Sequence, residues 1–190
     1  MILWLISVLI ETAALLAYQI RGGFPWFRTL LFFDTVFQIL AISAANTSWY
    51  RFTHRTAELS CSILTILAVI EAAPLIERPA RRAWTAFIIG IVCHAILFEP
   101  VWWSSTAGAV WGLVAGTHLM MASWLVLLML ESGVRTAHCL MLTAYCMGVA
   151  VCFYLSPFMP MAKPVDVWNS VCWVGFIWLV WNRRGAAGVK

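Results

Sequence analysis

Long apolar segments recur along the chain, separated by short clusters of polar, glycine and proline residues. Seven segments follow one another, at residues 1–20, 29–48, 57–76, 83–98, 106–130, 136–155 and 165–181. Each approaches the roughly 20 residues that a helix needs to cross the hydrocarbon core of a bilayer. Because the connections are short, we expect sequential helices to pack antiparallel. The pattern predicts an all-α, polytopic transmembrane bundle of about seven spans, forming one domain over residues 1–190. A six-span bundle is the alternative, because the fourth and seventh segments are short.

Composition agrees with this pattern. Hydrophobic residues make up 63% of the chain and charged residues only 11%, against about a quarter charged in an ordinary soluble domain. The net charge of +4 comes from residues at segment ends, so we expect the lipid bilayer as partner and no nucleic acid. The six cysteines lie within apolar segments and form no CxxC pair, which indicates packing residues.

Basic residues predict the orientation, because Lys and Arg near span ends stay cytoplasmic. Three of the twelve fall on one predicted side: Arg51, Arg55 and Lys163. The other nine fall on the opposite side: Arg21, Arg28, Arg78, Arg81, Arg82, Arg135, Arg183, Arg184 and Lys190. The sequence therefore predicts an external N-terminus and a cytoplasmic C-terminus.

Three acidic residues lie inside predicted spans. An ionisable side chain in hydrocarbon costs at least about 2.5 kcal/mol and needs a reason. Glu11, Asp34 and Glu71 all fall in the predicted inner half of the membrane, and Gln38 follows Asp34 at i+4 on the same helix face. One interpretation is a proton or cation site shared by the first three helices. The other is a set of structural hydrogen bonds between helices.

Two histidines form a second candidate site. His94 and His118 fall near the middle of the fourth and fifth predicted spans. Adjacent antiparallel helices could present both imidazoles to one haem iron. Each could instead hydrogen-bond a neighbouring side chain, so haem stays one alternative.

A tandem GxxxG motif marks the fifth predicted span, with glycines at Gly108, Gly112 and Gly116. Glycine at every fourth position makes a flat groove that another helix can approach closely. The groove predicts either internal packing or association with another membrane protein.

Several protein classes lack their required residues. Both lysines, Lys163 and Lys190, lie outside the seventh predicted span, so no retinal Schiff base is expected. The chain has neither HExxH nor GxSxG. We therefore predict a non-enzymatic protein.

Three stretches carry a resemblance to a known group: ETAALLAYQIRGGFPWFRTLLFFDTVFQIL, AELSCSILTILAVIEAAPLI and WVGFIWLVWNRR. Their arrangement resembles that of a group of small seven-helix bacterial membrane proteins with no assigned activity. The resemblance implies a multi-pass location in the bacterial cytoplasmic membrane and supplies no functional residues.

Three functions remain as hypotheses. The first is a membrane subunit or accessory protein that associates with other membrane proteins or with itself. The second is a small proton- or cation-coupled transporter or channel that uses the intramembrane carboxylates. The third is a haem-binding electron-transfer subunit.

Overall fold

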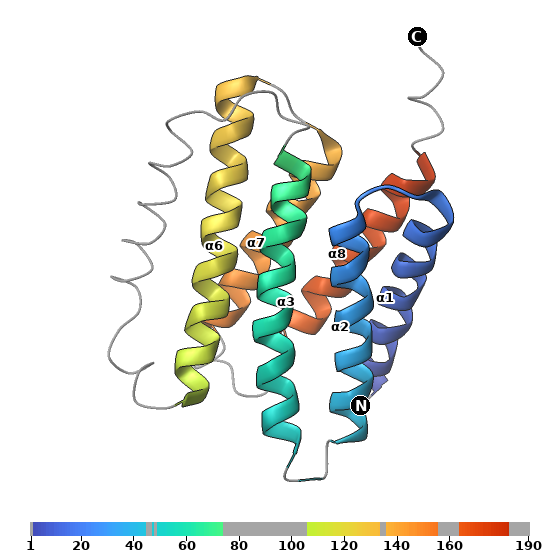
Figure 1. Ribbon diagram of the computed structural model, residues 1–190, viewed down its shortest axis with the longest axis vertical. Coiled ribbons are helices and arrows are strands. Elements are labelled where there is room, and N and C mark those ends of the chain that lie inside the picture. The colour runs from blue at the N-terminus through green and yellow to red at the C-terminus, as the bar shows by residue number, and fades with distance from the viewer. Residues whose placement is uncertain are drawn as a thin grey trace.

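The computed structural model describes residues 2–44, 47, 49–73, 106–133, 136–155 and 164–182. Within these ranges the regular structure is helical throughout (Figure 1). The helices are α1 (Ile2–Arg21), α2 (Pro25–Ser43), α3 (Tyr50–Ala72), α6 (Thr106–Ser132), α7 (Ala137–Leu155) and α8 (Pro164–Asn182). The predicted all-α class is confirmed. The predicted fourth span, residues 83–98, lies outside the described residues.

Glycine and proline residues set the first helix boundaries. Gly22 and Gly23 adopt positive φ angles of 72° and 87°, a conformation open to glycine because it has no Cβ atom. The Gly22 amide donates to the Tyr18 carbonyl at 3.0 Å, which closes α1. Pro25 then occupies the first turn of α2, where its missing N–H is not needed.

Two observed helices start earlier than the corresponding predicted spans. α2 begins at Pro25 rather than at residue 29, and α3 begins at Tyr50 rather than at residue 57. The prediction started each span where charges stop. A helix can continue past that point because its backbone hydrogen bonds are made within the helix and do not require apolar side chains.

The six described helices form a closed ring. In the order α1, α2, α3, α6, α7, α8, each packs against the next, and α8 returns to α1 (Figure 1). α1 and α8 run in parallel: Ser7 Oγ contacts the Asp166 carbonyl at 3.4 Å near one end, and the Arg21 guanidinium lies 4.3 Å from the Trp181 ring centroid at the other. α3 and α6 are also parallel neighbours, so α3 ends at one end of the bundle and α6 begins at the other.

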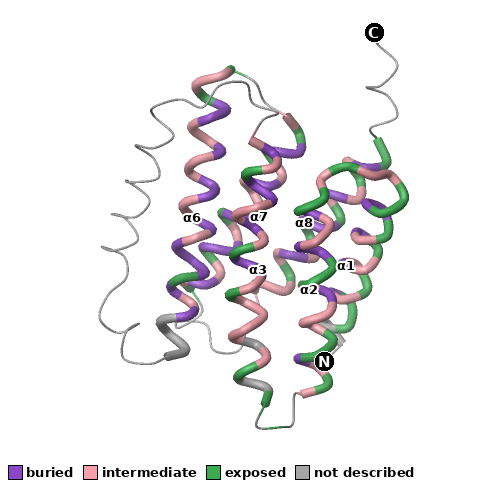
Figure 2. Tube along the Cα trace, viewed as in Figure 1, coloured by how far each residue is buried: buried purple, intermediate pink, exposed green. Residues whose placement is uncertain are grey.

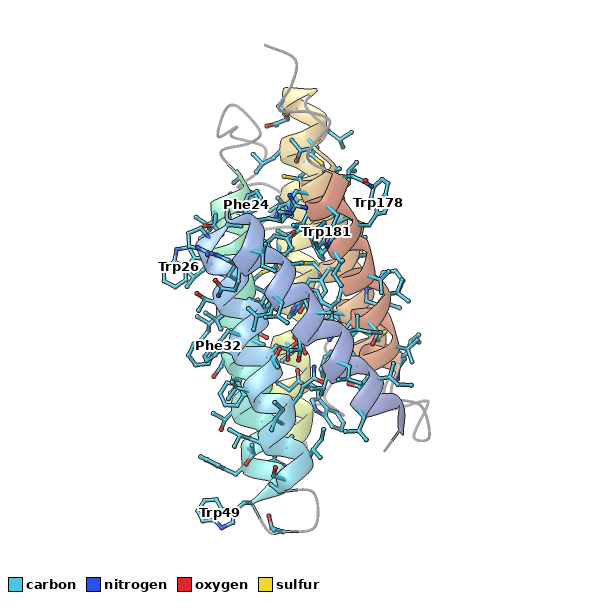
Figure 3. The ribbon with its side chains drawn as sticks, turned by 90° about the vertical axis from the view of Figure 1, so that its right-hand side faces the viewer. Phe24, Trp26, Phe32, Trp49, Trp178 and Trp181 are labelled. Atoms are coloured by element: carbon cyan, nitrogen blue, oxygen red, sulfur yellow. The ribbon has the colours of Figure 1, made fainter. Side chains whose placement is uncertain are left out.

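Large apolar side chains cover the outside of the ring. Leu9, Ile20 and Trp178 are each more than 60% exposed, and exposed residues alternate with buried ones along most helices (Figure 2). Trp26, Phe32 and Trp178 project away from the bundle in Figure 3. Soluble monomers rarely expose so much contiguous apolar surface.

Three of the described helical stretches are long and apolar enough to cross a membrane. They are Pro25–Ser43, Val110–Ser132 and Ala137–Leu155. Together with the apolar exterior, they fit a membrane protein.

Candidate functional site

Glu11 is the centre of the polar interior. Its side chain is completely buried, and its Oε2 atom accepts a hydrogen bond of 2.7 Å from the Gln38 side-chain amide. The predicted i, i+4 spacing makes this contact possible. Ser7 and Glu11 share the inner face of α1, and Asp34 and Gln38 share the inner face of α2.

Asp34 completes a pair of carboxyl groups. Its side chain lies within hydrogen-bonding reach of the Glu11 carboxyl group, and it accepts a weak bond of 3.6 Å from the Cys61 thiol on α3. Two carboxylates cannot bond each other unless one carries a proton. With both ionised, Glu11 Oε1 has no donor in the described part of the chain.

Two further acids join this pair, and the sequence interpretation did not include them. Glu58 of α3 interacts electrostatically with Asp34 and with Asp166 of α8, and Asp166 also acts on Glu11. The acid cluster therefore consists of Glu11, Asp34, Glu58 and Asp166. Four helices each contribute one member.

A helical pattern could have revealed the missing acids. Glu58 begins a polar stripe that continues through Cys61, Ser62 and Thr65 at i+3, i+4 and i+7. All three of these followers are buried. Asp166 likewise begins a stripe that continues through the buried Asn169. The sequence interpretation counted neither acid among the intramembrane residues, although each is the second residue of its predicted span.

Glu71 lies apart from the acid cluster. Its Oε2 atom accepts hydrogen bonds from the backbone amides of Trp26 and Phe27, at 3.0 and 3.2 Å. These amides belong to the first turn of α2, whose N–H groups lack partners within the helix. At 1.5 Å per residue, Asp34 lies about 11 Å further along α2. The structure thus brings Glu11, Asp34 and Gln38 together and places Glu71 as a cap of α2.

His118 occupies the opposite wall of the interior. Its Nδ1 atom lies 2.8 Å from the Val114 carbonyl, and because a carbonyl only accepts, Nδ1 carries the proton. Its Nε2 atom is buried and has no hydrogen-bond partner among the described residues. Its ring packs edge-on against Tyr145 of α7, with ring centroids 5.8 Å apart. The predicted partner, His94, lies outside the described residues.

The glycine groove faces neighbouring helices. Gly112 and Gly116 are buried, and α6 packs against α3 and α7. Gly108 belongs to the first turn of α6. The two described glycines of the groove are thus covered by other residues of this chain.

The polar side chains lie at one height in the bundle. The parallel helices α1 and α8 touch at Ser7–Asp166 and again at Arg21–Trp181. Counting along both helices between these contacts places Glu11 level with Ser170, which lies between Asn169 and Trp173. On α7, the Tyr18–His138 contact at 3.5 Å places Glu11 level with Tyr145, because α1 and α7 run in opposite directions.

The remaining helices meet the same level. Gln38 of α2 contacts Glu11 directly. On α3, Cys61 contacts Asp34, and Glu58 lies one turn before Cys61. On α6, His118 packs against Tyr145. All six described helices thus contribute to one polar layer. Its members are Glu11, Asp34, Gln38, Glu58, His118, Tyr145, Asn169 and Trp173.

Among the described residues, no group of three or more His, Cys, Asp or Glu side chains has the geometry to hold a metal ion. The fold and the polar layer define a helical bundle of the kind found in membrane proteins, with a buried interior rich in carboxyl groups. Comparison with protein-family models, with characterised proteins and with solved structures finds no match.

Proposed function

We propose that this chain is a small multi-pass membrane carrier in which the acid cluster binds and releases protons or small cations. The observation that carries this proposal is Glu11, which is fully buried, in contact with Asp34 and hydrogen-bonded to Gln38. Carriers commonly place ion sites near the bilayer midplane. Glu11 lies about half-way along α1, as such a site requires.

We include the predicted topology of seven spans, with the N-terminus outside and the C-terminus in the cytoplasm. The uneven distribution of Lys and Arg supports the orientation. The parallel neighbours α3 and α6 support the count, because the seven-span prediction places one further span between them. The seven-helix resemblance supports a bacterial cytoplasmic membrane.

The chemistry of the acid cluster favours an exchangeable proton. Two carboxyl groups in contact cannot both be ionised without strong repulsion, so such a pair holds one proton between them. A cation that arrives can replace this proton and keep the interior charge constant. This exchange couples the entry of the cation to the release of a proton.

The alternative is a purely structural cluster, in which the hydrogen bonds only hold helices together. Proton flux in vesicles containing the purified chain separates the two. We expect a cation gradient to drive a proton flux that Glu11→Gln abolishes, because glutamine keeps the hydrogen-bonding shape but cannot exchange a proton. Glu71→Gln is the matched control, since its amide oxygen can still accept from Trp26 and Phe27. Equal flux in the wild type and Glu11→Gln would contradict the proposal.

One observation favours a second candidate, haem binding. An axial histidine usually donates its other ring N–H to a carbonyl or carboxylate, and His118 donates from Nδ1 to Val114 while Nε2 stays unpartnered in the described region. A Soret band in the purified protein, lost in His118→Ala, would support an electron-transfer role. A colourless preparation would exclude it.

Association with other membrane proteins has less support from the geometry. The glycine groove proposed for it contains Gly112 and Gly116, which are buried between helices of this chain. Mass spectrometry of the gently purified protein would test this role, because an accessory subunit should retain a stoichiometric partner.

A further inference from the structure

Within the described part of the polar layer, the buried polar atoms that lack partners are mostly hydrogen-bond acceptors. Glu11 Oε1, Gln38 Oε1, Asn169 Oδ1 and His118 Nε2 have no partner among the described residues, and all belong to the polar layer. The Gln38 assignment follows from its bond to Glu11, because its Nε2 must be the donor. Trp173 Nε1 is the one unpartnered donor in the described layer. Unsatisfied buried groups are rare in proteins and point to a missing ligand, ion or water.

The charge around these atoms has one sign. The charged groups that act on Glu11 and Glu58 are other carboxyl groups, with no Lys or Arg among them in the part of the chain described. An occupant that balances this charge must therefore be cationic.

Two aromatic rings belong to the same layer. Trp173 is completely buried, its ring centroid lies 5.0 Å from that of Tyr145, and Tyr145 interacts electrostatically with Asp34 and Glu11. Aromatic faces attract organic cations, most strongly those of tryptophan. This pair supplies an apolar contact that a bare metal ion or a proton would not use.

We propose that the polar layer binds a small organic cation carrying N–H donors, a protonated amine or guanidinium group, which displaces the proton of the Glu11–Asp34 pair. This inference rests on the proposed carrier function and names its substrate class. The N–H groups bond the acceptors Glu11 Oε1, Gln38 Oε1 and Asn169 Oδ1, and Tyr145 and Trp173 cover the carbon side. The positive charge replaces the departing proton, so charge balances in the exchange.

Uptake of labelled guanidinium into vesicles containing the full chain tests this inference, since its permanent charge prevents passage through lipid in a neutral form. We expect saturable uptake, accompanied by proton movement in the opposite direction, and little competition from tetramethylammonium. That ion has the same charge but no N–H donor. Equal competition by tetramethylammonium would overturn the assignment of N–H recognition.

Two variants locate the site. Asn169→Leu removes an acceptor and keeps the branching and heavy-atom number of the side chain, and we expect guanidinium affinity to fall about tenfold, the effect of one lost good contact. Trp173→Leu should lower uptake at least as much. Trp178→Leu, on the lipid-facing side of the same helix, is its matched control and should keep wild-type uptake.

The outcomes separate this inference from the proposed function. Proton flux that depends on Glu11, without guanidinium uptake, would overturn only the substrate class. Absence of flux of either kind would overturn both. Unchanged guanidinium affinity in Asn169→Leu would move the binding site away from the polar layer. Circular dichroism and gel filtration establish that each variant is folded before its uptake is compared.

Discussion

At the scale of single residues, Gln38 stabilises the Glu11 carboxyl group in the interior. Its amide donates a hydrogen bond of 2.7 Å to the Glu11 carboxyl group. A polar group that is buried without such a partner carries its full desolvation penalty. Gln38 thus holds the Glu11 carboxyl group in its orientation.

We predict that Gln38→Leu lowers the free energy of unfolding by about 1–3 kcal/mol, because Glu11 loses its donor. Thermal unfolding in detergent measures this loss as a lower Tm. Gln19→Leu is the matched control. It removes a bond of 3.3 Å from Arg28 that is exposed at the helix ends, and exposed pairs contribute little. A Gln38→Leu variant as stable as Gln19→Leu would contradict the role assigned to Gln38.

The residue patterns predicted only part of the acid cluster. Helical spacing correctly placed Glu11, Asp34 and Gln38 on facing surfaces, because that information is local to two adjacent helices. Glu71 was predicted at the same membrane depth, yet it caps α2, because its carboxyl group accepts hydrogen bonds from the Trp26 and Phe27 amides in the first turn of that helix. The spacing of Asp166 and Asn169 marks one face of α8, but the proximity of Asp166 to Glu11 depends on the parallel contact of α1 with α8, which the sequence does not show.

At the scale of elements, the α7–α8 interface shows why small residues occur on facing helices. A Cβ atom at Gly148 would overlap the indole ring of Trp168, whose Nε1 atom donates to the Tyr145 carbonyl at 3.3 Å. The tandem glycines of α6 were predicted from their regular spacing. Gly148 has no such repeat, and the close contact that requires it arises only once α8 is in place.

We predict that Gly148→Ala destabilises the protein by about 1–3 kcal/mol, in the range for overpacking a close contact. The rigid Trp168 ring must move and loses its bond to Tyr145. Gly175→Ala provides the comparison, because the added Cβ there meets the flexible end of Met141. Thermal unfolding of both variants should therefore show a clearly larger loss for Gly148→Ala. Equal losses would mean that Trp168 yields as easily as Met141.

At the scale of the whole molecule, the ring of helices separates an apolar exterior from a polar layer in its interior. The sequence predicted the apolar exterior, because hydropathy gives the length of each segment and how apolar it is. It did not predict the ring or the common height of the polar side chains, which depend on which helices are neighbours. Helix order therefore converts scattered polar residues into one layer.

The proposed topology predicts opposite exposure of two surface positions. Thr47 follows α2 and is exposed, while the exposed Asn182 ends α8. We expect Thr47→Cys to react with a membrane-impermeant maleimide in intact cells, and Asn182→Cys to react only after the membrane is opened. The native cysteines described by the structure are buried or half-buried, which favours low background labelling. Labelling of both positions from outside would refute the orientation.

The central claim is that the Glu11–Asp34 pair holds a proton that an incoming cation displaces. Infrared difference spectroscopy of the purified protein measures this directly, through the carbonyl stretch of a protonated carboxyl group before and after guanidinium is added. The account predicts that this band disappears on addition of guanidinium to the wild type and to Glu71→Gln, and that Glu11→Gln shows no such change. A band that persists unchanged in the wild type would mean that the proton is structural, and would contradict the account.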